Sequence, residues 1–120
     1  MGKISIKSKI VSSEDNVDIK VTGIRTNNKM VYKENDKRVT ILIFDNKIEM
    51  NRYSNDYEIN LIFEKGKKTI SNYIIFGGSK VFELETITKK LSISDNKILI
   101  EYELEGNSFK YTLEMEDLWY

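Results

Sequence analysis

The stretch ILIEYELEGNSFKYTLEM, residues 98–115, decides the fold of this 120-residue chain. On both sides of the polar segment 105–108, apolar side chains alternate with polar or charged ones. A period of two predicts strands with one buried face, and a short polar segment containing glycine is typical of a hairpin turn. We therefore expect an antiparallel hairpin whose inward-facing side chains are Ile98, Ile100, Tyr102, Leu104, Phe109, Tyr111, Leu113 and Met115.

The same alternation continues through the rest of the chain, and no segment has a convincing helical stripe. Strands are predicted around residues 3–12, 17–23, 30–33, 39–44, 48–50, 57–63, 70–76 and 82–86. Asn27-Asn28, residues 34–37 and Asp45-Asn46 are expected to form polar turns. For residues 87–94 the pattern leaves open a bent strand or a helical turn. In the segment 70–76, we expect the inward face to consist of Ile70, Asn72, Ile74 and Phe76.

About ten short strands joined by short turns predict an antiparallel meander, and closure into a barrel removes its two exposed edges. A charge pattern supports this closure. The outward face of the first strand is basic, with Lys3, Lys7 and Lys9, whereas residues 98–120 hold six acidic side chains and one lysine. We expect these two strands to pair. The predicted architecture is one all-β domain, residues 1–120, folded as an antiparallel up-and-down barrel of about ten strands.

The composition excludes whole classes of chemistry. The chain has no His and no Cys, so it lacks an imidazole base, a thiolate nucleophile and the usual zinc ligands. We therefore expect no metal and no cofactor. With 19 basic and 19 acidic side chains, the formal net charge is zero, which argues against a nucleic-acid partner. The apolar runs are too short to span a membrane, so a cytoplasmic location is the expectation.

The order and spacing of several short motifs resemble one known family. The motifs are Ile4-x-Ile6-x-Ser8-x-Ile10, Val21-Thr22-Gly23, Tyr73-x-x-Phe76-Gly77, Phe82-x-Leu84-x-Thr86 and Ile98-x-Ile100-x-Tyr102-x-Leu104. Together they cover nearly the whole chain and resemble the YwiB-like proteins, bacterial β-barrels of the calycin-like (lipocalin) superfamily that form a domain of unknown function. The resemblance implies a ten-stranded, calycin-like barrel and no catalytic residue.

Polar side chains expected on the inward face are the candidates for a binding site. We single out Arg52, Asn72, Tyr102 and Tyr111 as lumen groups that could orient a ligand. The alternative is that each sits near a strand end, with its polar tip in water or bonded to the backbone. A buried guanidinium at position 52 would need an anionic partner or ligand. Because the expected inward positions are bulky and the chain has no Ala, the lumen is either partly or wholly packed.

Three function classes follow, in order of preference. The first is a non-enzymatic barrel that binds a small, mostly apolar ligand in its mouth. The second is a structural or protein-interaction module with a packed lumen, for which a homodimer is one form. The third, an enzyme using tyrosines or carboxylates, is least favoured. The alternation places Glu83, Glu85, Glu101 and Glu103 on the solvated face, which argues against a paired-carboxylate site such as glycosidases use.

Overall fold

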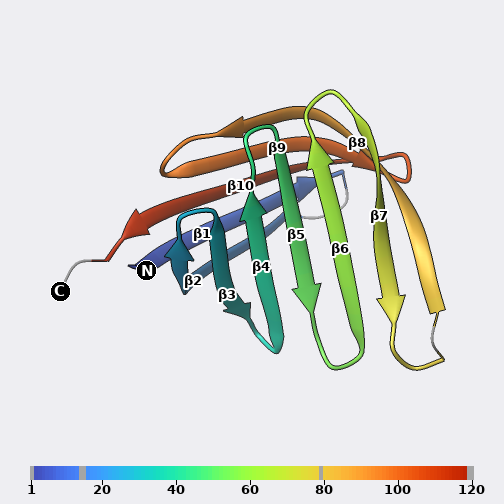
Figure 1. Ribbon diagram of the computed structural model, residues 1–120, viewed down its shortest axis with the longest axis horizontal. Helices are drawn as coiled ribbons and strands as arrows, with labels where there is room; N and C mark the ends of the chain where they lie inside the picture. Colours follow the sequence, from blue (N-terminus) through green and yellow to red (C-terminus); the bar gives the residue numbers. More distant parts are fainter. Residues whose placement is uncertain (1, 14–15, 79, 119–120) are drawn as a thin grey trace.

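The protein is a closed barrel built entirely from antiparallel strands. The computed structural model (Figure 1) describes residues 2–13, 16–78 and 80–118. Over these residues, ten strands each pair with their neighbours in sequence, and the first pairs with the last. The fold predicted from the alternation is confirmed. The strands are β1 (Gly2–Ser12), β2 (Asn16–Thr26), β3 (Lys29–Glu34), β4 (Lys37–Ile43), β5 (Lys47–Tyr53), β6 (Tyr57–Glu64), β7 (Lys68–Ile75), β8 (Lys80–Ile93), β9 (Lys97–Leu104) and β10 (Asn107–Asp117).

The pairing of β1 with β10 closes the sheet. Its register runs from Ile4 opposite Asp117 to Ser12 opposite Phe109. Lys7 lies opposite Glu114, as the complementary charge of the two strands predicted. Opposite charges that face each other across a strand pair contribute roughly 0.2–1 kcal/mol.

The described part of the chain contains no helix long and apolar enough to cross a membrane.

Turn residues match the local geometry that each hairpin needs. Between β9 and β10, Glu105 and Gly106 have φ angles of 48° and 83°. Positive φ at both central residues is the backbone of the two-residue hairpin turn whose twist matches that of the strands. The β4–β5 turn is closed by a hydrogen bond of 2.8 Å, in which the Phe44 amide donates to the Lys47 carbonyl. Asp45 and Asn46 occupy the centre of that turn, as expected.

The barrel is flattened into two layers whose strands cross. Its principal extents are 45, 33 and 27 Å. Figure 1 shows β3–β7 as the front layer, with β1, β2, β9 and β10 passing behind it, while β8 curves from one layer into the other. Inward-facing apolar side chains of both layers meet between them. The buried core consists of Ile4, Ile6, Met30, Tyr32, Val39, Ile41, Ile48, Met50, Leu61, Phe63, Leu91, Ile98, Ile100, Tyr102, Tyr111, Leu113 and Met115.

Aromatic rings fill the space between the two layers. Phe63 on β6 packs against Tyr102 on β9 with ring centroids 4.6 Å apart. Tyr102 in turn stacks on Phe109 of β10 at 5.3 Å. These three rings bridge the front and rear layers through the middle of the barrel. The inside is therefore packed with side chains along this line, as the bulky inward residues suggested.

The sequence assigned the wrong face of β7 to the interior. Ser71 is fully buried, whereas its neighbour Ile70 is 47% exposed, so the odd-numbered residues of this strand face inward. The reason is a set of hydroxyl hydrogen bonds. The Ser71 hydroxyl bonds the Thr86 hydroxyl at 2.8 Å and accepts from the Ile62 amide at 3.1 Å, while the Thr69 hydroxyl donates to the Ile62 carbonyl. The expected inward residues Ile70, Asn72, Ile74 and Phe76 therefore lie on the outer face.

The undecided segment 87–94 is a strand with a β-bulge. Lys89 is an extra residue, because Thr88 pairs with Tyr102 and Lys90 pairs with Glu101. A bulge leaves backbone groups of the strand without ladder partners. Next to the bulge, the β6–β7 turn bonds Thr88 on the side of β8 that faces β7. The Gly66 amide donates to the Thr88 carbonyl at 3.1 Å, and the Thr88 amide donates to the Lys67 carbonyl at 3.2 Å.

Gly23 on β2 is required by close packing. A Cβ atom there would lie 2.7 Å from Ile6 Cδ1, 2.8 Å from the Val31 carbonyl oxygen and 3.0 Å from Tyr32 Cβ. One of these contacts is to backbone, which cannot rotate away. Any side chain at this position would therefore push β2 away from β3.

We expect Gly23→Ala to lower the free energy of unfolding by about 1–3 kcal/mol, because the added methyl overpacks the β1–β2–β3 contact. Urea denaturation followed by circular dichroism measures this change. Gly77→Ala is the matched control, because a Cβ at position 77 meets nothing within 4 Å. Equal stability of the two variants would show that the backbone adjusts without cost.

Candidate functional site

A buried ion pair lies inside the barrel between β3 and β5. Arg52 Nη1 is 2.7 Å from Glu34 Oε2, and the two side chains are only 14% and 12% exposed. Both residues occupy inward positions of their strands, in line with Tyr32 on β3 and Met50 on β5. Most of the water around each charge is excluded, so each depends on the other for compensation.

Two tyrosine hydroxyls continue this polar cluster across the barrel. The Tyr32 hydroxyl on β3 lies 3.3 Å from the Tyr111 hydroxyl on β10, and both side chains are almost fully buried. The buried Ser8 hydroxyl on β1 also bonds Tyr32. The hydroxyls satisfy one another, as buried polar groups must. The cluster thus joins the front layer to the rear layer at a polar point in an otherwise apolar core.

Burial and charge shift the ionisation of these groups. Burial raises the pKa of Tyr102 to about 12, although the nearby Arg52 opposes this. Burial likewise raises the pKa of Tyr32 and lifts that of Tyr111 well above its ordinary value. For Arg52, burial acts to lower the pKa, but the Glu34 carboxylate and neighbouring tyrosines outweigh it, and the pKa is raised. At neutral pH the tyrosines are therefore uncharged and the guanidinium is charged.

Three of the four predicted site residues face the interior, and one does not. Arg52, Tyr102 and Tyr111 all point inward, and the charge of Arg52 acts on both tyrosines. The expectation that Asn72 faces the lumen is wrong, because it occupies an outward position of β7 in register with Asn60. Sequence reasoning also missed Glu34, which was assigned to a turn although it is the last residue of β3. The need of a buried guanidinium for an anion was the signal that could have found it.

One end of the barrel leaves part of the inner sheet face uncovered. Figure 1 shows the front strands running past the rear layer on the side where the β5–β6 and β7–β8 turns lie. Inward-facing side chains become more exposed toward this end. Along β6, inward residues change from half-buried Tyr57 to Phe63, which is 1% exposed. Along β8, Phe82 is 47% exposed, whereas the inward Thr86 is fully buried.

Three aromatic residues line this open end, and we call them the aromatic row: Tyr57, Tyr73 and Phe82. They come from the adjacent strands β6, β7 and β8. The Tyr57 and Tyr73 ring centroids are 5.6 Å apart, and those of Tyr73 and Phe82 are 6.3 Å apart. Lys37, at the start of β4, places its Nζ 5.7 Å from the centre of the Tyr57 ring. A hydrogen bond to Tyr57 raises the pKa of Lys37, so a cation stands beside the row.

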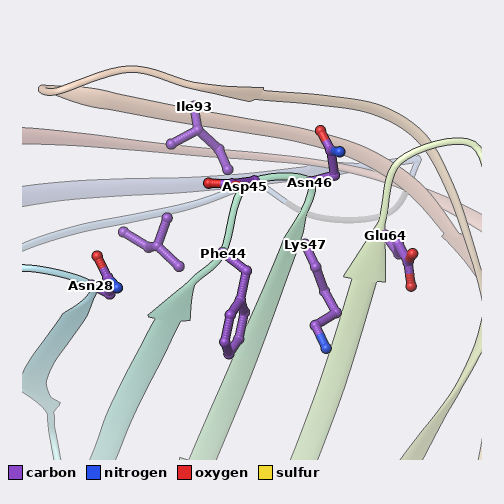
Figure 2. A pocket seen from close by; sticks show the side chains of 8 residues that line it. Asn28, Phe44, Asp45, Asn46, Lys47, Glu64 and Ile93 are labelled. Atoms are coloured by element: carbon purple, nitrogen blue, oxygen red, sulfur yellow. The ribbon is translucent and has the colours of Figure 1, made fainter.

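The opposite side of the barrel carries an open hollow of about 690 Å³. Figure 2 shows Ile93 of β8 above the β4–β5 turn, with Asn28 and Glu64 farther out on either side. Two of the charged side chains in the lining are already paired: Lys47 with Glu49 at 3.2 Å, and Glu64 with Lys67 at 3.0 Å. The hollow therefore offers three apolar side chains, Ile43, Phe44 and Ile93, and a polar rim on which Asp45 forms no ion pair with the described residues.

No arrangement for catalysis stands out among the described residues. The carboxylates considered from sequence lie outward, and three of them pair with lysines: Glu85 with Lys68, Glu103 with Lys89, and Glu101 with Lys90. No group of three or more acidic side chains in the described ranges is placed to hold a metal ion. Among the described residues, the inside of the barrel presents a shaped, aromatic surface and one ion pair, Arg52–Glu34.

These features define a closed, ten-stranded antiparallel β-barrel with a packed middle and an aromatic opening. The chain matches the family described as "Domain of unknown function (DUF1934)" over residues 4–116, and it belongs to that family. A solved structure with the same fold is the ywiB protein from Bacillus subtilis. It aligns with a TM-score of 0.71 over 98% of this chain and 91% of that chain, at 20% identity. The YwiB-like resemblance is thus confirmed. No curated protein matches the sequence.

We expect Arg52→Met to lower the free energy of unfolding by about 3 kcal/mol, because it leaves Glu34 as an uncompensated buried charge. Adding Glu34→Leu to this variant should recover most of the loss. Urea denaturation measures both effects. Lys47→Met removes a cation from the more exposed pair with Glu49 and should cost less than about 1 kcal/mol. A similar cost for Arg52→Met and Lys47→Met would contradict a role for burial.

The raised tyrosine pKa values predict loss of stability at alkaline pH. The folded pKa of Tyr102 is about 12, above the ordinary value of 10.0. The stability gained from keeping this phenol protonated is complete below about pH 10 and is lost as the pH rises toward 12. Denaturation from pH 8 to 12 should show a smaller decline for Tyr102→Phe than for the native chain. Tyr53→Phe, at a 41% exposed position, should leave the decline unchanged.

Proposed function

We propose that this domain is a non-enzymatic binding protein that holds a small, flat, mostly apolar molecule at the open end of its barrel. The observation that carries the proposal is the aromatic row on an inner sheet face that the rear layer leaves uncovered, where Phe82 is 47% exposed and Tyr57 and Tyr73 are only partly buried. Folding normally buries inward-facing aromatic side chains, which bring large apolar area to a core. Rings that keep contact with water on the inner face are available to a ligand.

The ligand class follows from the residues at this end. Tilted and edge-to-face rings offer faces and edges against which a planar molecule can pack. Lys37 adds one positive charge beside Tyr57. Arg52, which lies in the same register row as Tyr73, is already neutralised by Glu34. We therefore favour a planar ring system that carries an anionic or hydrogen-bond-accepting group at its edge.

The middle of the barrel is a less favourable place for a ligand. The line of rings from Phe63 through Tyr102 to Phe109 occupies the space between the layers. A molecule bound there would have to displace packed aromatic side chains, at a cost of several kcal/mol. Binding at the mouth requires no such rearrangement. This supports the open end over the lumen groups Arg52, Tyr102 and Tyr111 singled out from sequence.

The test uses the planar anionic fluorophore 1-anilinonaphthalene-8-sulfonate as the probe. We expect the native protein to bind it saturably and Tyr73→Ala to bind it about tenfold more weakly, through loss of ring contact. Tyr53→Ala is the control, because this exposed tyrosine lies near the same end but on the outer face of β5. Absence of saturable binding, or equal losses in both variants, would contradict the proposal.

A second measurement identifies the natural ligand class. Native mass spectrometry of freshly purified protein should show a fraction with added mass that disappears on denaturation. In Tyr73→Ala this fraction should fall, whereas in Tyr53→Ala it should persist. A bound mass that persists in Tyr73→Ala would place the ligand elsewhere and exclude the aromatic row as its site.

A further inference from the structure

The outer face of β6, β7 and β8 carries apolar side chains that the barrel does not use. Ile70 is 47% exposed, Phe76 is 40% exposed and Val81 is 61% exposed. Ile74 lies opposite Val81 in the β7–β8 register, and Ile62 occupies an outward position of β6. We call these five residues, together with Asn60 and Asn72, the outer patch. The sequence alternation predicts that four of these seven residues, Ile70, Asn72, Ile74 and Phe76, face inward. The outward side of this strand therefore has the composition expected of a side that faces the core.

A row of amide side chains crosses the middle of this patch. Asn51, Asn60 and Asn72 lie opposite one another on β5, β6 and β7. Asn51 Nδ2 donates to Asn60 Oδ1 at 2.6 Å and to Glu58 Oε2 at 2.6 Å. Within the described chain, the half-buried Asn72 amide and the Asn60 Nδ2 group have no hydrogen-bond partner. The Asn60 Nδ2 donor and the amide donor and acceptor of Asn72 therefore remain available.

The chemistry of this row is complementary to itself. A carboxamide carries both donors and an acceptor, so two carboxamides can hydrogen-bond each other reciprocally. The rows of apolar side chains on both sides of the amides would exclude water from such a contact. A twofold axis parallel to the strands would place β4 of one copy over β8 of the other. In that arrangement Arg38 of one copy lies over Val81 of the other, one outward position along β8 from Glu83.

The electrostatics also favour a second copy over a charged partner. The formal net charge is zero, so two copies do not repel each other at long range. At the margin of the patch, Lys68 is paired with Glu85 at 3.0 Å. A closed barrel has no free strand edge, so association through strand addition is not available. Contact between sheet faces is the remaining route.

We propose that the outer patch is the interface of a homodimer. The face spans β4–β8, about 20 Å across at ~4.8 Å between strands, and about 24 Å along them. The flat area of this face is therefore about 480 Å², which is less than the roughly 800 Å² per partner that a standard specific interface buries. The dimer is therefore in reversible equilibrium with the monomer. This proposal is independent of ligand binding, which concerns the opposite face of the same strands.

The test is sedimentation velocity over a range of protein concentrations reaching about 100 µM. We expect the native chain to show a concentration-dependent dimer and Ile70→Lys to remain a monomer. Ile24→Lys is the matched control, because Ile24 is 45% exposed and outward-facing on β2, away from the patch. It should dimerise like the native chain. A native monomer at all concentrations, or equal effects of the two lysine substitutions, would overturn the proposal.

A second variant tests the amide row itself. Asn72→Asp preserves the size of the side chain. With β7 of one copy over β5 of the other, it places a carboxylate opposite Asn51, whose amide is bonded to the Glu58 carboxylate, so like charges approach each other in the dimer. We expect it to weaken the dimer at least tenfold, with partial recovery at high salt because salt screens the repulsion. Circular dichroism melting curves should coincide with those of the native chain, since residue 72 points away from the core. An unchanged dimer in Asn72→Asp would exclude the amide row from the interface.

Discussion

The pairing of β1 with β10 is the constraint on which the rest of the structure depends. It joins the two ends of the chain along most of the length of both strands, from Ile4 opposite Asp117 to Ser12 opposite Phe109. With this seam in place, every strand has two neighbours and the sheet has no edge to protect. The inner face of the sheet then encloses one core, which is mostly apolar apart from the Arg52–Glu34 pair and a few hydroxyls. Closure also fixes which strands face each other across the interior.

Flattening of the closed sheet determines where the interior is filled and where it is open. Where the layers overlap, large side chains such as Phe63 and Tyr102 meet directly. The Arg52–Glu34 pair is shielded from most of the surrounding water. Where the front strands extend beyond the rear layer, inward positions have nothing opposite them. The partial exposure of the aromatic row at that end is thus a consequence of strand length and of the crossing of the two layers.

The sequence predicted the architecture well because alternation and turn chemistry are local signals. The hairpin of residues 98–115 and the closure of the barrel could both be read from side-chain pattern and charge. The inward face of β7 could not. Its core positions include the hydroxyls of Thr69 and Ser71, which bond to the Ile62 backbone and to Thr86, while isoleucines cover the outside. The polarity of a side chain predicts an exposed position only when no buried hydrogen-bond partner is available. Here the partners come from other strands.

Part of the candidate site could be predicted from the sequence for a related reason. Arg52, Tyr102 and Tyr111 lie in strands with a clear period of two, so their direction was predictable. Glu34 lies at the end of a short strand with a weak pattern, and its inward direction depends on the register with β4. The aromatic row was harder still, because Tyr57, Tyr73 and Phe82 have the composition of a core. Only the crossing of the two layers determines that they lie where the core ends.

The extra residue in β8 gives this strand two different phases. Before Lys89 the even-numbered side chains Thr86 and Thr88 face inward, and after it the odd-numbered Leu91 and Ile93 do. In a strand with regular alternation, two consecutive residues face opposite sides of the sheet, so one of the neighbours Lys89 and Lys90 would point into the core. The bulge lets both lysines face outward, where they are exposed and pair with Glu103 and Glu101 of β9. One extra residue thus keeps two consecutive charges in water while Thr88 and Leu91 on either side stay buried.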